Sequence, residues 1–195
     1  MVRIVTDSCA DMPPEIMEKH RVACVPLSVT LSTGTYRENI DLGKERFYEL
    51  LSGETATPRT SQPSPADFES VFAPAMTASD DMVCVLMSSG LSGTYQGACM
   101  VRDQLEYKNC YIVDTLCATG GQRILLDEAI RMRDEGKSAK EIFDALEALK
   151  TRVNLNTMMN TLEFLYRGGR ISKAVYMLGA FARLKPIMQD RKSVV

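Results

Sequence analysis

The sequence has no tryptophan, a single histidine and no long apolar run. A helix that crosses a bilayer needs ~20 consecutive apolar residues, and no stretch approaches this length. The first residues, MVRIVTDSCADMPP, carry one arginine and then acidic and polar side chains, so they lack the apolar segment of a signal peptide. We therefore expect a cytoplasmic protein.

The chain also lacks any excess of basic residues. Its 23 lysines and arginines are offset by 25 acidic residues, which gives a net charge of −2, and the two signs are interspersed. A protein that binds nucleic acid needs a basic stripe or patch to neutralise phosphates. We expect no nucleic-acid partner, and a DNA-binding regulator is the least favoured class of function.

Six cysteines are present, but none forms a CxxC pair, and His20 alone cannot complete a zinc site. Cys24, Cys84 and Cys110 lie in apolar, strand-like runs, where free thiols of a reducing compartment are expected. The sequence predicts no metal site and no cofactor.

The 195 residues are 45% hydrophobic, which is enough to build a substantial core. Short apolar runs that predict buried strands alternate with stretches of helical periodicity. The predicted strands span 2–6, 22–31 with an irregularity at Pro26, 81–87 and 110–114. Helices are expected after Asp41, around Phe68, after Thr94, over 119–134 up to Gly136, and after a capping box at Ser138, with a loop over 55–65.

This alternation predicts an α/β fold class, with a mostly parallel sheet covered by helices on both faces. Beyond Thr151 the sequence becomes richer in glycine, methionine and basic residues. We expect one α/β domain over residues 1–152, and the start of a second α/β domain over 153–195.

The segment SSGLSGT, residues 88–94, follows the strand expected at 81–87 and precedes a helix. The sequence predicts Ser92 as the helix N-cap and Gly93 as the first helical residue. The free amides of a helix start favour an anion such as a carboxylate. An ordinary N-cap, in which Ser92 bonds only its own helix, remains an equally simple interpretation.

Two further segments are candidate binding sites. Thr60 and Ser61 in TSQPS offer hydroxyl donors on a proline-bounded loop, although a turn before a capped helix explains them as well. Arg170 in GGRIS follows two glycines that permit close backbone approach to a ligand, although a helix C-cap with a solvated arginine is an alternative.

Two enzyme or cofactor-binding functions compete for the SSGLSGT loop. A serine hydrolase using Ser92 or Ser88 needs a base, and the chain has only His20 and no GxSxG elbow. A phosphate- or nucleotide-binding module usually adds a Walker lysine or a ribose-binding acid, and neither is evident.

The motifs occur in the order in which the DegV family has them, and the resemblance runs across essentially the whole chain. They are IVTDS with Asp11 and Pro13, then TSQPSP, SSGLSGTYQ, VDT and TLEFLYRGGRIS. Family members resemble the fatty-acid-binding subunit of bacterial fatty acid kinase. They hold a fatty acid between two α/β domains and present its carboxylate to a separate kinase subunit.

The resemblance implies that this chain binds a long-chain fatty acid and is not itself an enzyme. Thr60, Ser92 and the Gly93 amide are similar to the family's carboxylate ligands. Ser61 and Asn156 are implied to lie near the ligand, and Arg170 near the head-group opening.

The implied partners are the fatty acid and the catalytic subunit of a fatty acid kinase, and transient contact with a membrane surface stays open. Family members continue well past the end of this sequence, so we expect the second domain to be truncated here.

Overall fold

The computed structural model describes residues 1–53, 57–158, 160–181 and 187–189. A four-stranded sheet lies at its centre, with the strand order β2-β1-β6-β7 and every neighbouring pair parallel. The strands are β1 (Val2–Asp7), β2 (Val22–Val25), β6 (Asp81–Leu86) and β7 (Cys110–Asp114). The predicted parallel sheet is therefore confirmed.

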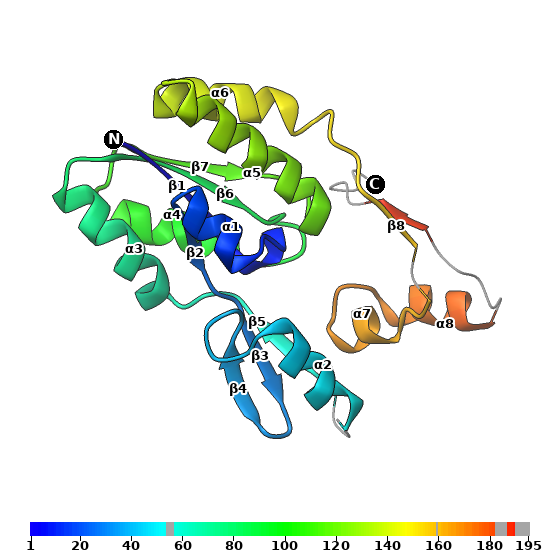
Figure 1. Ribbon diagram of the computed structural model, residues 1–195. Coiled ribbons are helices and arrows are strands. Elements are labelled where there is room, and N and C mark those ends of the chain that lie inside the picture. Colours follow the sequence, from blue (N-terminus) through cyan, green and yellow to red (C-terminus); the bar gives the residue numbers. More distant parts are fainter. Residues whose placement is uncertain (54–56, 159, 182–186, 190–195) are drawn as a thin grey trace.

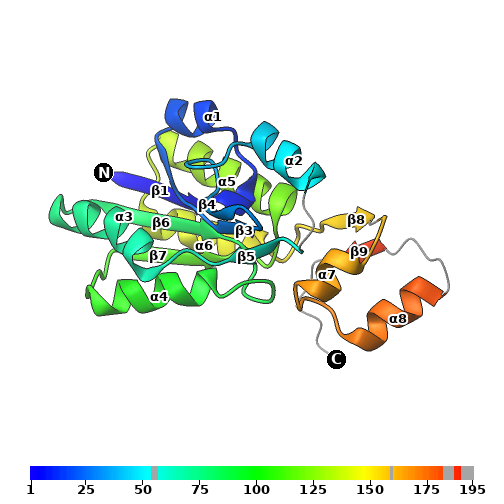
Figure 2. The same ribbon diagram turned by 90° about the horizontal axis from the view of Figure 1, so that it is seen from below.

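Helices cover both faces of this sheet, as predicted (Figure 1). The first face carries α1 (Pro14–Lys19), α5 (Thr119–Asp134) and α6 (Ala139–Leu149), and the second carries α3 (Pro65–Thr77) and α4 (Thr94–Gln104). Figure 2 shows α3 and α4 side by side beneath the sheet. Successive side chains of β1 alternate between the two cores, because Ile4 packs against the first set and Val5 against the second.

Local signals set the helix boundaries. At the start of α6, the Ser138 hydroxyl accepts a hydrogen bond from the Glu141 amide, and the Glu141 carboxylate accepts one from the Ser138 amide. This is the predicted capping box. A second one joins Ser64 and Asp67 at α3. Gly136, with a φ of +81°, follows the end of α5, in the left-handed conformation that glycine adopts without strain.

A second, antiparallel sheet was not expected from the sequence. It has the order β4-β3-β5, formed by β3 (Ser28–Leu31), β4 (Gly34–Arg37) and β5 (Arg59–Ser61). The apolar region 22–31 breaks around Pro26, so that β2 joins the parallel sheet and β3 joins this one. The loop predicted over 55–65 is wrong in part, because β5 pairs with β3 there.

The helix expected after Asp41 is present as α2 (Lys44–Ser52). It packs on the antiparallel sheet through Phe47 and Leu50, against a small core of Val29, Leu31 and Leu42. In Figure 1 this unit lies below the parallel sheet, at the end where the strands finish.

The C-terminal part comprises β8 (Asn156–Met158), α7 (Glu163–Arg167), α8 (Lys173–Phe181) and β9 (Ile187–Gln189). β8 and β9 pair antiparallel. Figures 1 and 2 show α7 and α8 beyond the end where the parallel strands finish, rather than stacked on the sheet. The division into 1–152 and 153–195 stays a prediction, and its last residues, 190–195, lie outside the described residues. No helix in the described ranges is long and apolar enough to span a membrane.

Candidate functional site

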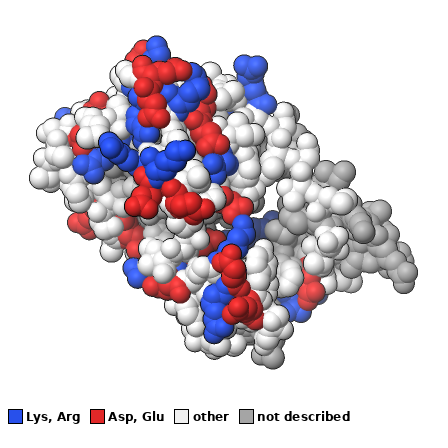
Figure 3. All heavy atoms as spheres, viewed as in Figure 1, with Lys and Arg blue, Asp and Glu red and all other residues white. Residues whose placement is uncertain are grey.

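A cleft of about 860 Å³ lies where the antiparallel sheet, α2, the loop after β6 and α7 meet. Figure 3 shows the surface hollowed between the lobe that carries α2 and the C-terminal helices. Carboxyl ends of parallel strands are where α/β proteins usually bind ligands. Apolar side chains make up much of its wall, namely Leu27, Val29, Leu42, Phe47, Leu51, Met87, Leu91, Phe164 and Leu165. A largely apolar hollow with a few polar groups is typical of a small-molecule site.

The loop after β6 is held in place by backbone groups. The Ser88 amide donates to the Cys117 carbonyl at 2.8 Å, and the Ser89 amide donates to the Asp114 carboxylate at 3.0 Å. The Gly90 amide donates to the Ser88 hydroxyl at 3.2 Å. Asp114, in the VDT motif, thus fixes the loop that carries the candidate ligand Ser92.

Ser92 lines the cleft, but its place in the helix differs from the prediction. α4 begins at Thr94 with Gly93 as N-cap, so the predicted N-cap at Ser92 is wrong by one residue. The Ser92 hydroxyl lies 2.8 Å from the Thr94 hydroxyl and accepts from the Thr94 amide at 3.3 Å. It therefore serves the first helical residue while remaining half-exposed to the cleft.

Thr60 and Ser61 reach the same cleft from β5, where Thr60 pairs with Val29 of β3. Both side chains are exposed, and within the described part of the chain the Thr60 hydroxyl has no hydrogen bond. The structure thus brings Thr60, Ser61, Ser92 and Arg170 together from distant parts of the sequence.

Arg170 ties the C-terminal part to the loop after β6. Its Nε donates to the Leu91 carbonyl at 3.3 Å and its Nη1 to the Gly168 carbonyl at 2.6 Å. Gly169, with a φ of +77°, makes the turn that directs Arg170 back toward the loop.

Two predicted residues do not line the cleft. Gly93 lies beside it, as the N-cap of α4. Asn156 is exposed on β8, paired with Gln189 of β9. Their roles toward a ligand stay predictions.

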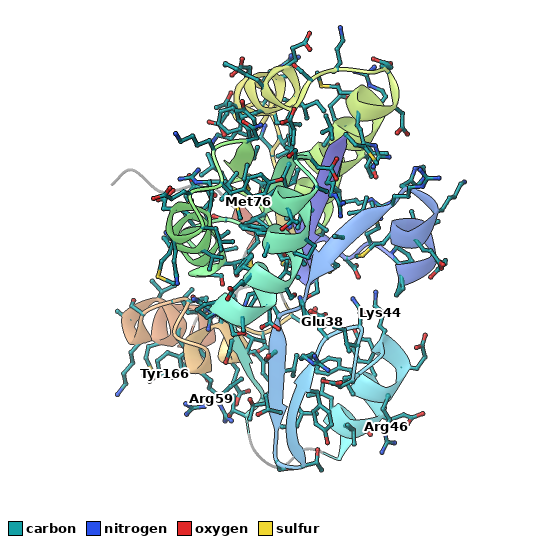
Figure 4. All side chains as sticks on the ribbon, turned by 90° about the vertical axis from the view of Figure 1, so that its left-hand side faces the viewer. Glu38, Lys44, Arg46, Arg59, Met76 and Tyr166 are labelled. Atoms are coloured by element: carbon teal, nitrogen blue, oxygen red, sulfur yellow. The ribbon has the colours of Figure 1, made fainter. Side chains whose placement is uncertain are left out.

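Three further basic residues line the cleft, and the sequence did not identify them as site residues. They are Lys44, Arg59 and Arg167. Figure 4 shows Lys44 on α2 and Arg59 on β5, on the two elements that flank the cleft. Arg167 donates to the Thr57 hydroxyl at 2.6 Å, and Lys44 pairs with Asp11 at 3.0 Å. Lys44 and Arg59 lie outside the motifs, and Arg167 lies within TLEFLYRGGRIS, three residues before Arg170. Only the tertiary fold shows that all three share one cleft.

Two acids lie at and beneath the floor of the cleft: Glu38, half-buried directly after β4, lines it, and Asp7, fully buried at the end of β1, lies behind it. The Ser8 hydroxyl donates to the Glu38 carboxylate at 2.7 Å and accepts from the Leu27 amide at 3.0 Å. Behind it, the Asp7 carboxylate accepts from the Met87 amide at 2.8 Å. The motif IVTDS therefore supplies structural contacts that join β1 to the cleft walls.

Burial changes the protonation of these acids. Burial raises the pKa of Asp7 to about 6. This effect outweighs the hydrogen bonds from the Met87 amide and the Gln122 side chain, which lower the pKa. Burial likewise raises the pKa of Glu38, against the lowering effect of its bond to Ser8. Both carboxyls therefore favour the neutral form more than an exposed acid does.

The single histidine lies at the other end of the sheet. His20 lines a separate hollow of about 690 Å³ together with Arg3, Arg133 and Lys137. It cannot act as the base for Ser92 or Ser88, and the hydrolase alternative loses the group that it required. Within the ranges that the structure describes, no cluster of three potential metal ligands is present.

The comparisons with known proteins agree over the whole chain. The model of the DegV family matches residues 1–195. A DegV domain-containing protein of Caldanaerobacter subterraneus is 33% identical over 189 residues, which cover 97% of this chain and 67% of that protein. This chain therefore spans about two thirds of the length of that relative.

Two solved structures extend this likeness to the fold. The first, described as the fatty acid binding of a DegV family protein from Thermus thermophilus, has 35% identity and a TM-score of 0.83, covering 97% of this chain and 68% of its own. A stearic-acid-binding protein of Eubacterium ventriosum has 28% identity and a TM-score of 0.87, covering 98% and 68%. This chain belongs to the DegV family.

Proposed function

We propose that this protein binds one long-chain fatty acid in the cleft, with the carboxylate between Thr60 and Ser92. The observation that carries the proposal is that two hydroxyls from separate elements, β5 and the start of α4, line one largely apolar cleft. Fatty acid binding by the Thermus thermophilus and Eubacterium ventriosum relatives supports the same ligand class.

The head-group end combines hydroxyl donors with a positive field. Arg59, Arg167 and Arg170 line the cleft with Thr60 and Ser92. Arginine side chains attract a carboxylate at long range, while neutral hydroxyls orient it at short range. Because the hydroxyls form no tight ion pair, the carboxylate stays accessible for a later reaction.

The apolar wall accounts for affinity. Burying a methylene contributes ~0.8 kcal/mol, so a dozen methylenes give an upper bound near ~10 kcal/mol before association costs. The volume of about 860 Å³ lies within the range of roughly 300–1,000 Å³ that is usual for ligand pockets. A ligand held this tightly survives purification.

The direct test is extraction of the purified protein with organic solvent, followed by mass spectrometry. We expect near-stoichiometric long-chain fatty acid. A lipid-free protein that also fails to take up added oleic acid would contradict the proposal, provided that the longer relatives bind it under the same conditions.

A separate kinase completes the proposed function. The chain presents the bound carboxylate to a fatty acid kinase catalytic subunit, which phosphorylates it with ATP in the cytoplasm. The motif order shared with the DegV family supports this role. The buried cysteines Cys84 and Cys110, which form no disulfide, support a reducing compartment.

The kinase proposal has its own assay. With a cognate kinase subunit and ATP, the bound fatty acid should become an acyl phosphate, which hydroxylamine traps as a hydroxamate. The chain with ATP alone should give none. Formation of acyl phosphate by the chain alone would make it an enzyme and overturn this assignment.

A further inference from the structure

Gln62 lies across the start of α4, directly after the two hydroxyl residues of β5. A Cβ built on Gly93 would lie 1.9 Å from Oε1 and 3.0 Å from Cδ of Gln62. A Cβ on Gly97 would lie 3.5 Å from Nε2 of the same side chain. The Gln62 side chain therefore occupies the groove that these two glycines, one helical turn apart, leave open on α4.

We propose that Gln62 is a positioning residue that fixes the distance between the Thr60 and Ser92 hydroxyls. Its backbone continues the strand that carries Thr60, and its carboxamide rests on the residue after Ser92. The inference rests on the proposed function, because it explains how two separate elements hold one carboxylate.

The need for such a link follows from how the two elements are anchored. β5 has three residues and, among the strands that the structure describes, pairs only with β3, in the antiparallel sheet. α4 instead packs under the parallel sheet through Ala98 and Val101. Two donors on separately anchored elements must be held within ~0.5 Å to share one carboxylate. Gln62 supplies a direct contact between them.

The contact also explains why residue 93 is a glycine. A methyl group at 1.9 Å from Oε1 forces the end of the Gln62 side chain out of the groove, because Cβ atoms essentially never approach another atom to less than 3.0 Å. At Gly97 the contacts to Gln62 and Phe68 are 3.5 Å, which is ordinary van der Waals distance. Gly93→Ala should therefore disturb the site and Gly97→Ala should not.

A double-mutant cycle tests the link. The affinity of delipidated protein for cis-parinaric acid, a fluorescent long-chain fatty acid, is measured for Gln62→Ala, Gly93→Ala and the double variant. Each single variant should weaken binding by ~5- to 20-fold, the range of coupled neighbours. In the Gln62→Ala background, Gly93→Ala should add less than ~2-fold, because the side chain it displaces is gone. Additive losses would contradict the link.

A second measurement separates positioning from general stability. Oleic acid and oleyl alcohol, which lacks the carboxylate, compete with the bound probe. Gln62→Ala should lower the preference for the acid and leave the affinity for the alcohol nearly unchanged. A merely structural role would weaken both ligands alike and would refute the positioning role.

Matched variants control for the substitutions themselves. Gly120→Ala, in α5, places a methyl where nothing lies within 4 Å, and Gln96→Ala removes an exposed glutamine from α4, the helix that follows Gly93. Both should leave binding and the melting temperature unchanged. If Gln62→Ala unfolds, the ratio of the fatty-acid affinities of Gly93→Ala and Gly97→Ala still tests the link. Equal losses of affinity in these two variants would contradict it.

The failure of this inference is distinguishable from the failure of the proposed function. If Ser92→Ala and Thr60→Val weaken binding but Gln62→Ala does not, only the positioning role is wrong. If none of the three variants changes the affinity, the carboxylate site itself is elsewhere.

Discussion

The two ends of the parallel sheet each carry a hollow of similar size, and their linings differ. The hollow at the amino ends, of about 690 Å³, is lined by Arg3, Lys19, His20, Arg133 and Lys137. The cleft at the carboxyl ends, of about 860 Å³, combines apolar walls with hydroxyls and arginines. Size alone does not separate the two.

The difference lies in what folding already explains. The carboxyl-terminal ends of helices α1 and α5 lie at the amino-end hollow, and Lys19 and Arg133 belong to the last turns of these two helices. Cations are favoured there because they offset the negative end of the helix dipole. At the cleft, the exposed Thr60 hydroxyl, which has no hydrogen bond among the described residues, and the exposed aromatic side chains of Tyr48 and Phe164 contribute nothing comparable to the fold. A ligand accounts for them better.

The largest expected effect comes from removing both proposed donors. Ser92→Ala and Thr60→Val should each weaken fatty-acid binding by ~10- to 100-fold, since a charge-assisted bond contributes on the order of 1.5–3 kcal/mol. The double variant should lose more than ~100-fold, although not the full product, because both groups share one carboxylate. Calorimetric titration with oleic acid measures this.

Hydroxyl residues away from the cleft and the histidine of the amino-end hollow provide the controls for Ser92→Ala and Thr60→Val. Ser70→Ala and Thr77→Val remove hydroxyls from α3, and His20→Ala alters the amino-end hollow. None should change the affinity. A loss on His20→Ala equal to that on Ser92→Ala would move the site to the amino end.

The second largest effect is expected on stability, at Asp7, the buried acid beneath the cleft. The pKa of Asp7 is raised from 3.8 to about 6, so its contribution to stability is fully present below about pH 4 and is lost as pH rises through about 6. As pH rises across this window, the free energy of unfolding of the wild type, measured in urea, should fall by on the order of 3 kcal/mol relative to that of Asp7→Asn. A difference that does not change with pH would show that the fold does not raise the pKa of Asp7.

A third effect tests the apolar wall. Leu51→Ala removes part of the cleft lining from α2 and should weaken binding by ~10-fold, or roughly 1–2 kcal/mol of lost contact. Ile124→Ala, at an exposed position of α5, is the matched control and should have no effect. Equal affinities of both variants and the wild type would place the acyl chain outside this wall.

The smallest effect concerns the amino end, where the acid responds to pH in the opposite direction. The chain's amino group and Arg3 hold the pKa of Asp80 below its usual range. A lowered pKa gives stability that is present above the unfolded pKa and is lost as pH falls through the folded value. Asp80→Asn should therefore lower the melting temperature slightly at neutral pH and not in strong acid. A drop that persists in strong acid would rule out the ionic contribution.

Local sequence patterns predicted the parallel sheet well, because its strands are short apolar runs with clear boundaries. The runs at 81–87 and 110–114 match β6 and β7, and the capping box at Ser138 marks the start of α6. These features depend on neighbours in the chain. β5 was missed because its three polar residues become a strand only by pairing with β3.

The candidate site was predictable only where a motif marked it. Thr60, Ser61, Ser92 and Arg170 lie in motifs, and the structure places all four on the cleft. Arg59 lies outside the motifs, Arg167 lies within TLEFLYRGGRIS without having been identified as a site residue, and no local pattern predicts the contact between Gln62 and Gly93. These contacts depend on how the antiparallel sheet, α7 and the loop before α4 are placed around the cleft, which periodicity does not encode.

The most direct test of the central claim is photolabelling with a palmitic acid that carries a diazirine on its chain. After irradiation, peptide mass spectrometry locates the attached lipid. We expect saturable labelling of peptides from α2 and α7, competed by oleic acid and reduced in the Thr60→Val/Ser92→Ala variant. Labelling confined to the peptides around His20 and Arg133 would contradict it.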